Sequence, residues 1–507
     1  MTPVHQLGFT NILLFGAGLW LATNIVRRIF NRNAQGTKLN GPPPDSWFFG
    51  VSRKITQSTD AGLLFQEWAA KYGPVFQVPI AFRGRRTILC DPKAVNHFYS
   101  MERSVYAKSG LARAVISNLF GRGLVWAEGE SHKRQRKALT PAFSNASIRR
   151  LTSVFFDSSH KAILFRLDSI GIAGFSHDFR TLDGEYSAVA AAFDSLSFEG
   201  TGLLSGLVLI LGIQFPFLAH LPTARNRIMG NLRKTMSVIA DELLEKTRRE
   251  KKSHVTDETA DRSVIGLILK AAEDDAELHM NETEVVAQVR NLPTDISLTW
   301  TLIELAKKPE TQAKLREELV QFGVADPTWD QLVSNLPYLD AVVLEILRLH
   351  PPVGETTREA IVDDVVPLGE LITTASGEVV DSIAVAKGSI VTVSIRCMNR
   401  SEVFWGPNAK EFEPERWLTL NDDHLRAKEI QGHRHLITFI DGPRTCLGKS
   451  FALAEFKAAL SVIIKNFTFE FPGGPETEIG THRAIIPRPK VVGQPGANVP
   501  LKVRRAD

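Results

Sequence analysis

A short segment near the C-terminus constrains this chain more than any other, and it reads FIDGPRTCLG over residues 439–448. Beyond Cys446, apolar residues recur every three or four positions, at Leu453, Phe456, Leu460, Ile463 and Phe467. This spacing predicts a helix with one buried face. We therefore expect Cys446 at a helix start, where unpaired backbone amides and a partial positive charge favour a thiolate.

The neighbours of Cys446 favour a flat ligand that carries carboxylates. Gly442 permits a tight turn, and Gly448 allows a bulky planar group to approach the backbone. Arg444 presents a fixed fork of donors to a carboxylate. The sequence thus predicts a cradle for a planar metal macrocycle. Two other interpretations are a buried structural cysteine, the usual state of a free thiol, and a cysteine nucleophile, for which no motif supplies the His and Asn or Asp partners.

The composition is that of a large globular enzyme. The 507 residues are 44% apolar and 23% charged, and 60 basic against 56 acidic side chains give a net charge of +4. This balance does not indicate a nucleic-acid partner. With three cysteines, Cys90, Cys397 and Cys446, no disulfide framework is expected. Cys90 and Cys397 stand in apolar, strand-like surroundings and are interpreted as core residues.

An apolar segment near the N-terminus predicts a membrane anchor. Residues 7–26 contain no charged side chain, and twenty helical residues span roughly 30 Å, the thickness of a bilayer core. Basic residues follow at Arg27, Arg28 and Arg32 but none precedes the segment, which places the remainder in the cytosol. We therefore expect a single-pass anchor with its basic stop over residues 1–40 and a catalytic domain over 41–507. A cleaved signal peptide is the alternative, although its basic residues would come first.

A second apolar stretch covers residues 202–222 and also lacks Lys, Arg, Asp and Glu. Two interpretations of this stretch are open: a second membrane span, and a core helix followed by an interfacial loop. The polar residues within the stretch favour the core helix.

The cysteine segment resembles the haem-binding loop of the cytochrome P-450 superfamily. Its pattern FxxGxRxCxG, followed by Ala452, matches at every specified position. The resemblance implies a mainly α fold with a small β portion and a heme b cofactor (iron protoporphyrin IX). It also implies that Cys446 is the thiolate ligand to iron, Arg444 contacts a propionate and Phe439 packs on the ligand side of the haem. Gly448 would lie against the macrocycle.

Two further motifs follow the order of this family. Within AVVLEILRL at 341–349, Glu345 and Arg348 are three residues apart and share a helix face. The later FEPERW resembles the family's loop whose arginine, here Arg416, completes a Glu-Arg-Arg triad. We expect these residues to hold the core beneath the cysteine loop.

The run ESHKRQRKALTP at 130–141 resembles the family's C helix. His132 and Arg136 lie four residues apart on one face, and the resemblance makes both of them propionate contacts, together with Arg358. The other basic residues of the run would face outward and attract an acidic electron donor, namely Lys133, Arg134 and Lys137. Elsewhere, residues 75–79 and 86–90 predict a strand pair, and 379–393 predicts strands broken at Lys387-Gly388.

The central helix departs from the family pattern. Its usual small-Gly-acid-Thr element, which relays protons to iron-bound oxygen, is absent, and by comparison about six residues are missing near NLPTDIS at 291–297. Pro293 predicts a helix break there. Thr294 and Asp295 are candidates for the relay, and as the simpler alternative they cap the helix that restarts. A second shortening is indicated at 162–168.

The function that these resemblances imply is a membrane-anchored haem-thiolate monooxygenase of the endoplasmic reticulum. It would oxidise a lipophilic small molecule, such as a terpenoid of fungal secondary metabolism, in contact with membrane lipid. The expected electron donors are NADPH-cytochrome P-450 reductase and cytochrome b5. The substrate pocket is expected from 101–123, 198–222, 352–357 and 480–486. The alternatives are a haem-thiolate isomerase or dehydratase, an inactive variant, and a membrane-tethered scaffold without haem.

Overall fold

The computed structural model describes residues 36–58, 60–81, 84–161, 295–323, 325–419, 426–482, 488–494 and 496–506, with isolated positions between 208 and 284. The predicted anchor at 7–26 and the shortening at 162–168 lie outside these residues, as does nearly all of the apolar stretch at 202–222. Within the described residues, no helix has both the length and the apolar character needed to cross a bilayer.

Helices are the commonest regular elements in the described residues. Helices α3, α4 and α5 begin with an Asp or Ser side-chain cap; at α4, for example, the Asp91 side chain accepts from the Ala94 N–H. The α-helices are α2 Ser52–Gln57, α3 Ala61–Tyr72, α4 Pro92–Ser100, α5 Gly110–Leu119, α6 Gly129–Leu139, α7 Asn145–Lys161, α14 Asp295–Lys307, α15 Pro309–Val320, α16 Trp329–Ser334, α17 Pro337–Leu349, α18 Ile395–Asn399, α19 Glu402–Trp405 and α20 Lys449–Asn466. The 3₁₀ turns are η2 Thr140–Phe143, η6 Pro414–Trp417, η7 Arg426–Glu429 and η8 Gly442–Arg444.

Within the described residues, the strands form one five-stranded sheet and three two-stranded ribbons. They are β1 Val75–Pro79, β2 Arg85–Leu89, β3 Tyr106–Ala107, β4 Glu355–Ala360, β5 Asp364–Thr373, β6 Val379–Val385, β7 Ile390–Ser394, β8 Phe467–Glu470, β9 Ile479–His482, β10 Arg488–Val491 and β11 Lys502–Arg505. The large sheet has the order β1-β2-β7-β4-β3. Its β1 and β2 pair antiparallel, and β7 adds parallel to β2. The predicted strand pair and the break near Lys387-Gly388 are confirmed.

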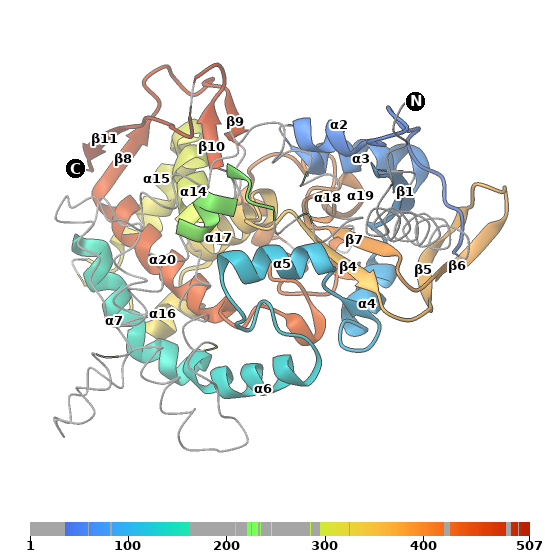
Figure 1. The fold of residues 1–507 in the computed structure, drawn as a ribbon. Coiled ribbons are helices and arrows are strands. Elements are labelled where there is room, and N and C mark those ends of the chain that lie inside the picture. The colour runs from blue at the N-terminus through green and yellow to red at the C-terminus, as the bar shows by residue number, and fades with distance from the viewer. Residues whose placement is uncertain are drawn as a thin grey trace, which may run out of the picture.

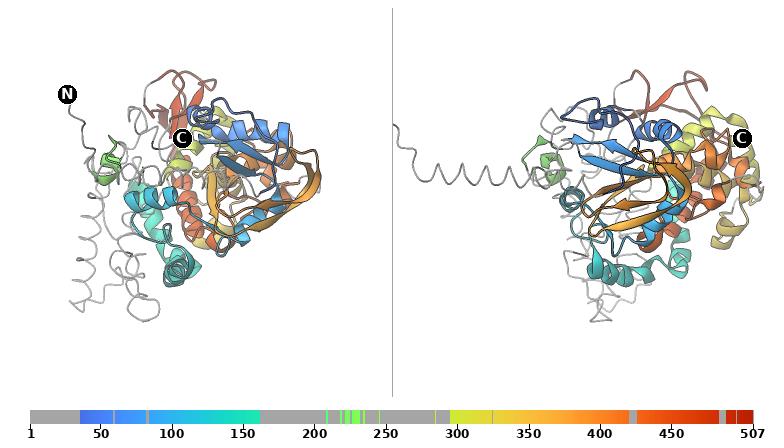
Figure 2. Two further views of the ribbon diagram at one scale, coloured as in Figure 1. Left: turned by 45° about the vertical axis from the view of Figure 1, so that its right-hand side comes forward. Right: turned by 90° about the vertical axis from the view of Figure 1, so that its right-hand side faces the viewer.

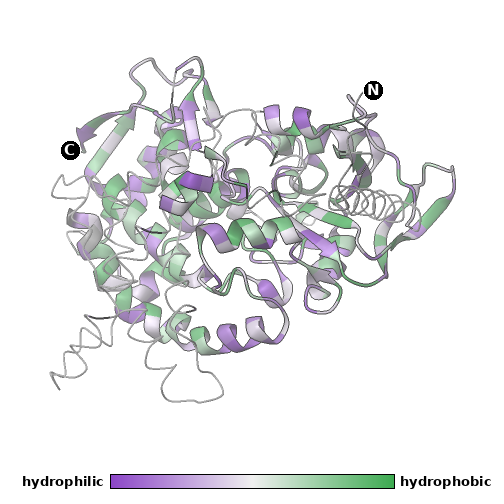
Figure 3. Ribbon diagram, viewed as in Figure 1, coloured by the Kyte–Doolittle hydropathy of each residue, from purple (hydrophilic) through white to green (hydrophobic). Residues whose placement is uncertain are grey.

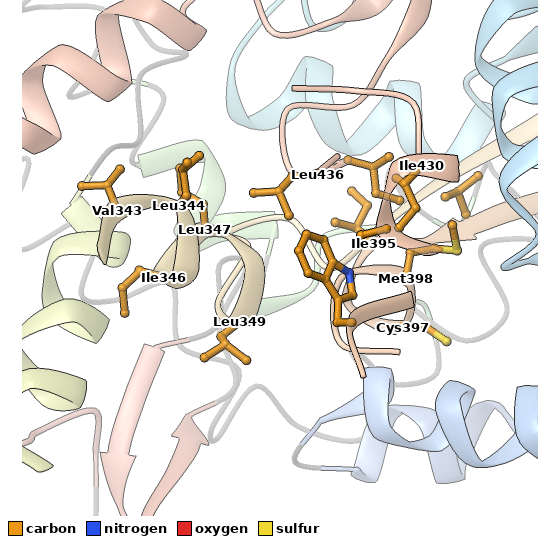
Figure 4. Close-up of a cluster of buried hydrophobic side chains, with 14 of the residues drawn as sticks. Val343, Leu344, Ile346, Leu347, Leu349, Ile395, Cys397, Met398, Ile430 and Leu436 are labelled. Atoms are coloured by element: carbon orange, nitrogen blue, oxygen red, sulfur yellow. The ribbon is translucent and has the colours of Figure 1, made fainter. Parts of the chain in front are cut away.

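The helices and the sheet occupy different sides of the molecule. In Figure 1, α7, α14 to α17 and α20 gather on one side, and the large sheet with α2, α3 and α4 lies on the other. Figure 2 shows the same division from two further directions. Helices α17 and α18 both contribute fully buried apolar side chains to the cluster drawn in Figure 4, among them Val343, Ile346 and Ile395. The mainly α fold with a small β portion is confirmed.

The helix after the cysteine loop differs from its expected form. The residues 449–466 do form a helix, α20, but it is buried on nearly all sides and not along one stripe. Phe456 and Leu460 are buried as predicted, whereas Leu453 and Ile463 are half-buried and Phe467 opens β8. Buried Ala458, Ala459 and Ser461 are small enough to let neighbouring elements approach α20 closely, which the apolar spacing could not show.

Both remaining cysteines lie in the core. Cys90 follows β2 and Cys397 lies in α18, and they are 5% and 2% exposed. Their sulfur atoms are 3.4 Å apart, and burial with the neighbouring Cys397 thiol raises the pKa of Cys90. The interpretation of these residues as core cysteines is confirmed.

Candidate functional site

The loop that carries Cys446 is built by backbone hydrogen bonds and a tight turn. The Cys446 N–H donates to the Phe439 carbonyl over 2.9 Å, and the Thr445 N–H donates to the Gly442 carbonyl over 3.1 Å. Gly442 has φ +68°, and a Cβ there would stand 2.5 Å from the Tyr99 carbonyl oxygen. The turn therefore requires glycine at this position, as predicted. Gly448 is the N-cap residue of α20, two residues after Cys446.

Cys446 is an exposed residue whose thiol is nevertheless partly desolvated by neighbouring protein. The residue is exposed, yet desolvation by surrounding protein raises the pKa of its thiol. The Gly448 N–H and the charges of Arg136 and Lys449 favour the thiolate, but they do not outweigh that burial. The helix start therefore favours the thiolate as expected, while burial of the thiol opposes it. A bound metal cation would supply the missing stabilisation, because a coordinating thiol loses its proton.

Basic side chains converge on one buried region next to this loop. His132 lies on α6 and is 4% exposed. Burial lowers its pKa to about 3, and the charges of Arg444, Lys108, Arg136 and Arg103 lower it further. The helix itself is rich in hydrophilic residues, which appear purple in Figure 3. His132 and Arg136 are thus brought together with Arg444, which is distant from them in the sequence.

Two carboxylates already lie within this cluster of cations. Glu128 accepts from Lys108 Nζ over 2.9 Å and also pairs with Arg444. The Arg358 Nε lies 2.7 Å from an oxygen of Glu102, whose side chain is fully buried. Burial raises the pKa of Glu102 despite the nearby charges of Arg358 and Arg444.

Sequence reasoning missed Lys108, Glu128 and Glu102. None of them falls in a motif, and Lys108 stands in the link between β3 and α5. A weak signal was present for Lys108, because a lysine immediately before a predicted apolar helix lies at the positive end of the helix dipole. A glutamate at a helix start is an ordinary placement and gave no signal.

The residues present fit a macrocycle that carries carboxylates and a metal. Among the described residues, no three His, Cys, Asp or Glu side chains converge as a metal site. A metal on Cys446 would therefore take its other ligands from a bound group. The cations Arg103, Lys108, Arg136, Arg358 and Arg444 outnumber the carboxylates Glu102 and Glu128, and the buried Nε atom of Arg444 has no hydrogen-bond partner among the described residues. This excess of positive charge, part of it buried, suits two carboxylates of a bound haem.

The remaining predicted site residues are Phe439, Gly448, Thr294 and Asp295. Phe439 is half-buried, and its ring centroid lies 6.0 Å from that of His433. A Cβ on Gly448 would meet only ordinary contact with Phe143, so protein packing does not demand glycine there. Thr294 lies outside the described residues, and Asp295 is the first residue of α14. Their roles stay predictions.

The outward basic face of α6 is smaller than expected. Lys133 and Lys137 are exposed as predicted, but Arg134 is half-buried. Its guanidinium pairs with the buried Glu284 over 2.5 Å. The expectation that Arg134 faces outward is wrong, because this carboxylate holds it against the protein.

A buried ionic triad connects α17 with η6. In α17, Arg348 donates to Glu345 through two 2.8 Å hydrogen bonds, and both side chains are fully buried. Arg416, from η6, donates to the same carboxylate over 3.0 Å. Burial would raise the pKa of Glu345, but Arg348 and Arg416 together lower it. The predicted Glu-Arg-Arg arrangement is confirmed as a set of contacts.

The Arg348 guanidinium also connects α17 to the segment that leads to the cysteine loop. It donates to the Asn399 carbonyl over 2.9 Å, and the Asn399 amide donates to Thr438 Oγ1 over 2.8 Å. Thr438 directly precedes Phe439 in the cysteine loop. The triad therefore acts on the loop through Asn399 and Thr438, without touching Cys446 itself.

Taken together, the fold and the site define a haem-thiolate protein. Comparison with known proteins agrees. The family model for cytochrome P450 matches residues 41–492. The chain is similar to cytochrome P450 monooxygenase claP of Ampulloclitocybe clavipes, at 54% identity, and to claQ of the same fungus, at 53%, with each match covering 100% of both chains. This chain therefore belongs to the cytochrome P450 family, and it is a monooxygenase of that family, whose members hold a haem iron.

More distant comparisons support the fold. A cytochrome P450 monooxygenase numbered 205 from Postia placenta is 32% identical over 99% of both chains. The crystal structure of the cytochrome P450DA heme domain superposes with a TM-score of 0.70 at 19% identity, covering 93% of this chain and 98% of that chain. At this identity the structural likeness shows the shared fold alone.

The match to claP also bears on length. It extends over 541 aligned positions, while this chain has 507 residues. At least 34 positions of that match thus have no residue here. The relative claP therefore carries residues that this chain lacks.

Proposed function

We propose that this chain is a membrane-anchored monooxygenase that binds heme b and oxidises a lipophilic small molecule in fungal secondary metabolism. The observation that carries the proposal is the convergence of an accessible Cys446 thiol with a buried, predominantly cationic cluster. When bound, haem supplies the oxygen chemistry. The chain's own residues bind and orient it: Cys446 as the iron ligand, and His132, Arg136, Arg358 and Arg444 toward the carboxylates.

The substrate class is inferred from apolar residues in the expected pocket segments. Residues 111–118 of α5 are all half-buried, among them Leu111, Val115 and Ile116. Val353, in the segment before β4, is 53% exposed. Apolar side chains left accessible in these segments favour a lipophilic ligand.

We further propose that electrons come from NADPH-cytochrome P-450 reductase, with cytochrome b5 as a second donor, and that the protein resides in the endoplasmic reticulum membrane. Cytochrome P450 monooxygenases generally need a redox partner. The exposed Lys133 and Lys137 on α6 favour an acidic docking partner, and the apolar segment at 7–26 supports the membrane location.

The test uses the full chain expressed with added haem and combined with the reductase in membranes. We expect the reduced protein with carbon monoxide to show the haem-thiolate Soret band. NADPH and ¹⁸O-labelled dioxygen should give a product that carries one labelled oxygen. Protein purified without haem would overturn the proposal.

A second candidate is an isomerase or dehydratase with the same haem-thiolate site. It is favoured by the missing acid–Thr element at 291–297. Product formed without NADPH or dioxygen, and without label, would support it. In that case Thr294 and Asp295 would be capping residues and not a proton relay.

A further inference from the structure

Glu128 occupies an unusual position for a carboxylate. It is the N-cap residue of α6, yet its side chain makes no capping hydrogen bond to the helix. Its Oε1 instead accepts from the backbone N–H of Lys108 over 3.2 Å and from Lys108 Nζ over 2.9 Å, and its other oxygen pairs with Arg444. The Glu128 carboxylate thus binds two cations and leaves the start of α6 without a side-chain cap.

A second carboxylate near these two cations is that of Glu102, which pairs with Arg358. The side chains of Lys108 and Arg444 are 7% and 5% exposed, and both also donate to the Ala127 carbonyl, over 3.4 and 3.1 Å. Burial and the charge of Arg444 lower the pKa of Lys108 to about 8, even with Glu128 beside it. Both cations would therefore gain from an additional anion.

We propose that Glu128 competes with the haem carboxylates for Lys108 and Arg444, and that it thereby weakens haem retention and lowers the reduction potential of the iron. Donors that Lys108 and Arg444 direct at Glu128 are not available to the cofactor, and like charges repel strongly in a partly desolvated site. A negative charge near the macrocycle also disfavours the reduced iron, which has one positive charge fewer. The proposal rests on the haem binding argued above.

The test replaces Glu128 by glutamine in the holoenzyme. Glu128→Gln keeps an acceptor for the Lys108 N–H but removes the charge. We expect haem transfer to excess apomyoglobin to slow on the order of tenfold, the size of an effect of one charge pair in a partly buried site. The midpoint potential of the iron should become more positive.

The chain offers a matched control on the same helix. Glu130→Gln removes an equal charge two residues away, from a side chain that is 91% exposed and 3.8 Å from Lys133. This variant should leave both haem transfer and midpoint potential as in the parent. An equal shift in both variants would show a general charge effect and overturn the proposal.

A purely structural role makes the opposite prediction. If Glu128 only ties α6 to Lys108 and the cysteine loop, Glu128→Gln loses haem faster and leaves the potential unchanged. Glu128→Ser guards against simple misfolding, because serine is a good N-cap residue and removes the same charge. Failure of both variants to hold haem would overturn the proposal, whereas absence of haem from the parent protein would overturn the proposed function instead.

Discussion

At the scale of single residues, Cys446 makes the sharpest prediction. Cys446→Ser replaces the thiolate ligand by a weaker oxygen donor, so the reduced carbon monoxide complex should lose its haem-thiolate Soret band. The measurement is the absorbance spectrum of protein purified with added haem. Cys397→Ser is the matched control, since Cys397 is a thiol of the buried core, and it should retain the band. An unchanged spectrum in Cys446→Ser would contradict the ligand assignment.

His350 predicts a pH dependence of stability. Its ring lies parallel to Trp300, with centroids 4.0 Å apart, and its Nε2 lies 2.8 Å from Glu304. Burial lowers the pKa of His350 to about 4, although Glu304 opposes that shift. As pH falls below 6.5, the unfolded histidine takes up a proton that the folded one refuses, so stability declines toward pH 4.

Between pH 7 and 5 this group should remove about 1–2 kcal/mol from the free energy of unfolding. Urea unfolding followed by tryptophan fluorescence measures the loss. His350→Gln should show a correspondingly shallower decline over the same interval. Parallel curves for the parent and His350→Gln would mean that His350 titrates alike in the folded and unfolded chains.

At the scale of elements, the contact between α17 and η6 should carry much of the stability of the cysteine loop. Arg416→Ala leaves the fully buried Glu345 with one arginine fewer, and breaking such a buried pair costs about 3–5 kcal/mol. We expect a lower urea midpoint and a reduced haem content in the purified protein. The side chain that is lost does not contact Cys446, so any remaining haem should keep its thiolate spectrum.

Arg426→Ala provides the control for this prediction. Arg426 also comes from a short 3₁₀ turn and pairs with Glu429 and Glu370, but its side chain is 41% exposed. Exposed pairs of this kind contribute about 0–1 kcal/mol. Equal losses in Arg416→Ala and Arg426→Ala would show that the burial of Glu345 has no special importance.

Elements that carry a strong local signal could be predicted from the sequence. The β1–β2 pair, the break before β7 and the Glu345–Arg348 pair follow from period, turn residues and helix spacing. The burial of α20 on nearly all sides could not be predicted, because it depends on neighbours distant in the chain. The same holds for Lys108 and Glu128, which acquire their charged partners only when the link before α5, the start of α6 and the cysteine loop come together.

At the scale of the whole molecule, the family assignment supports a monooxygenase, whereas the missing acid–Thr element favours a haem protein without oxygen activation. The relatives claP and claQ match the full chain, yet at least 34 aligned positions of claP have no counterpart here. The cysteine loop, the cation cluster and the ionic triad lie in 102–136 and 345–446, outside both inferred shortenings. The residues predicted to hold haem are therefore present, whereas the predicted proton relay falls in the segment at 291–297.

The predicted anchor can be tested on the complete chain. A segment of twenty residues without charge, followed by Arg27, Arg28 and Arg32, should hold the protein in microsomes through an alkaline carbonate wash. Deleting residues 1–40 should move the haem protein to the supernatant, while replacing 7–26 with an unrelated apolar segment of equal length should keep it in the pellet. Proteolysis of sealed microsomes should degrade the domain from the cytosolic side. A deletion variant that still resists carbonate would show that other parts of the chain insert into the bilayer, with 202–222 the next segment to remove.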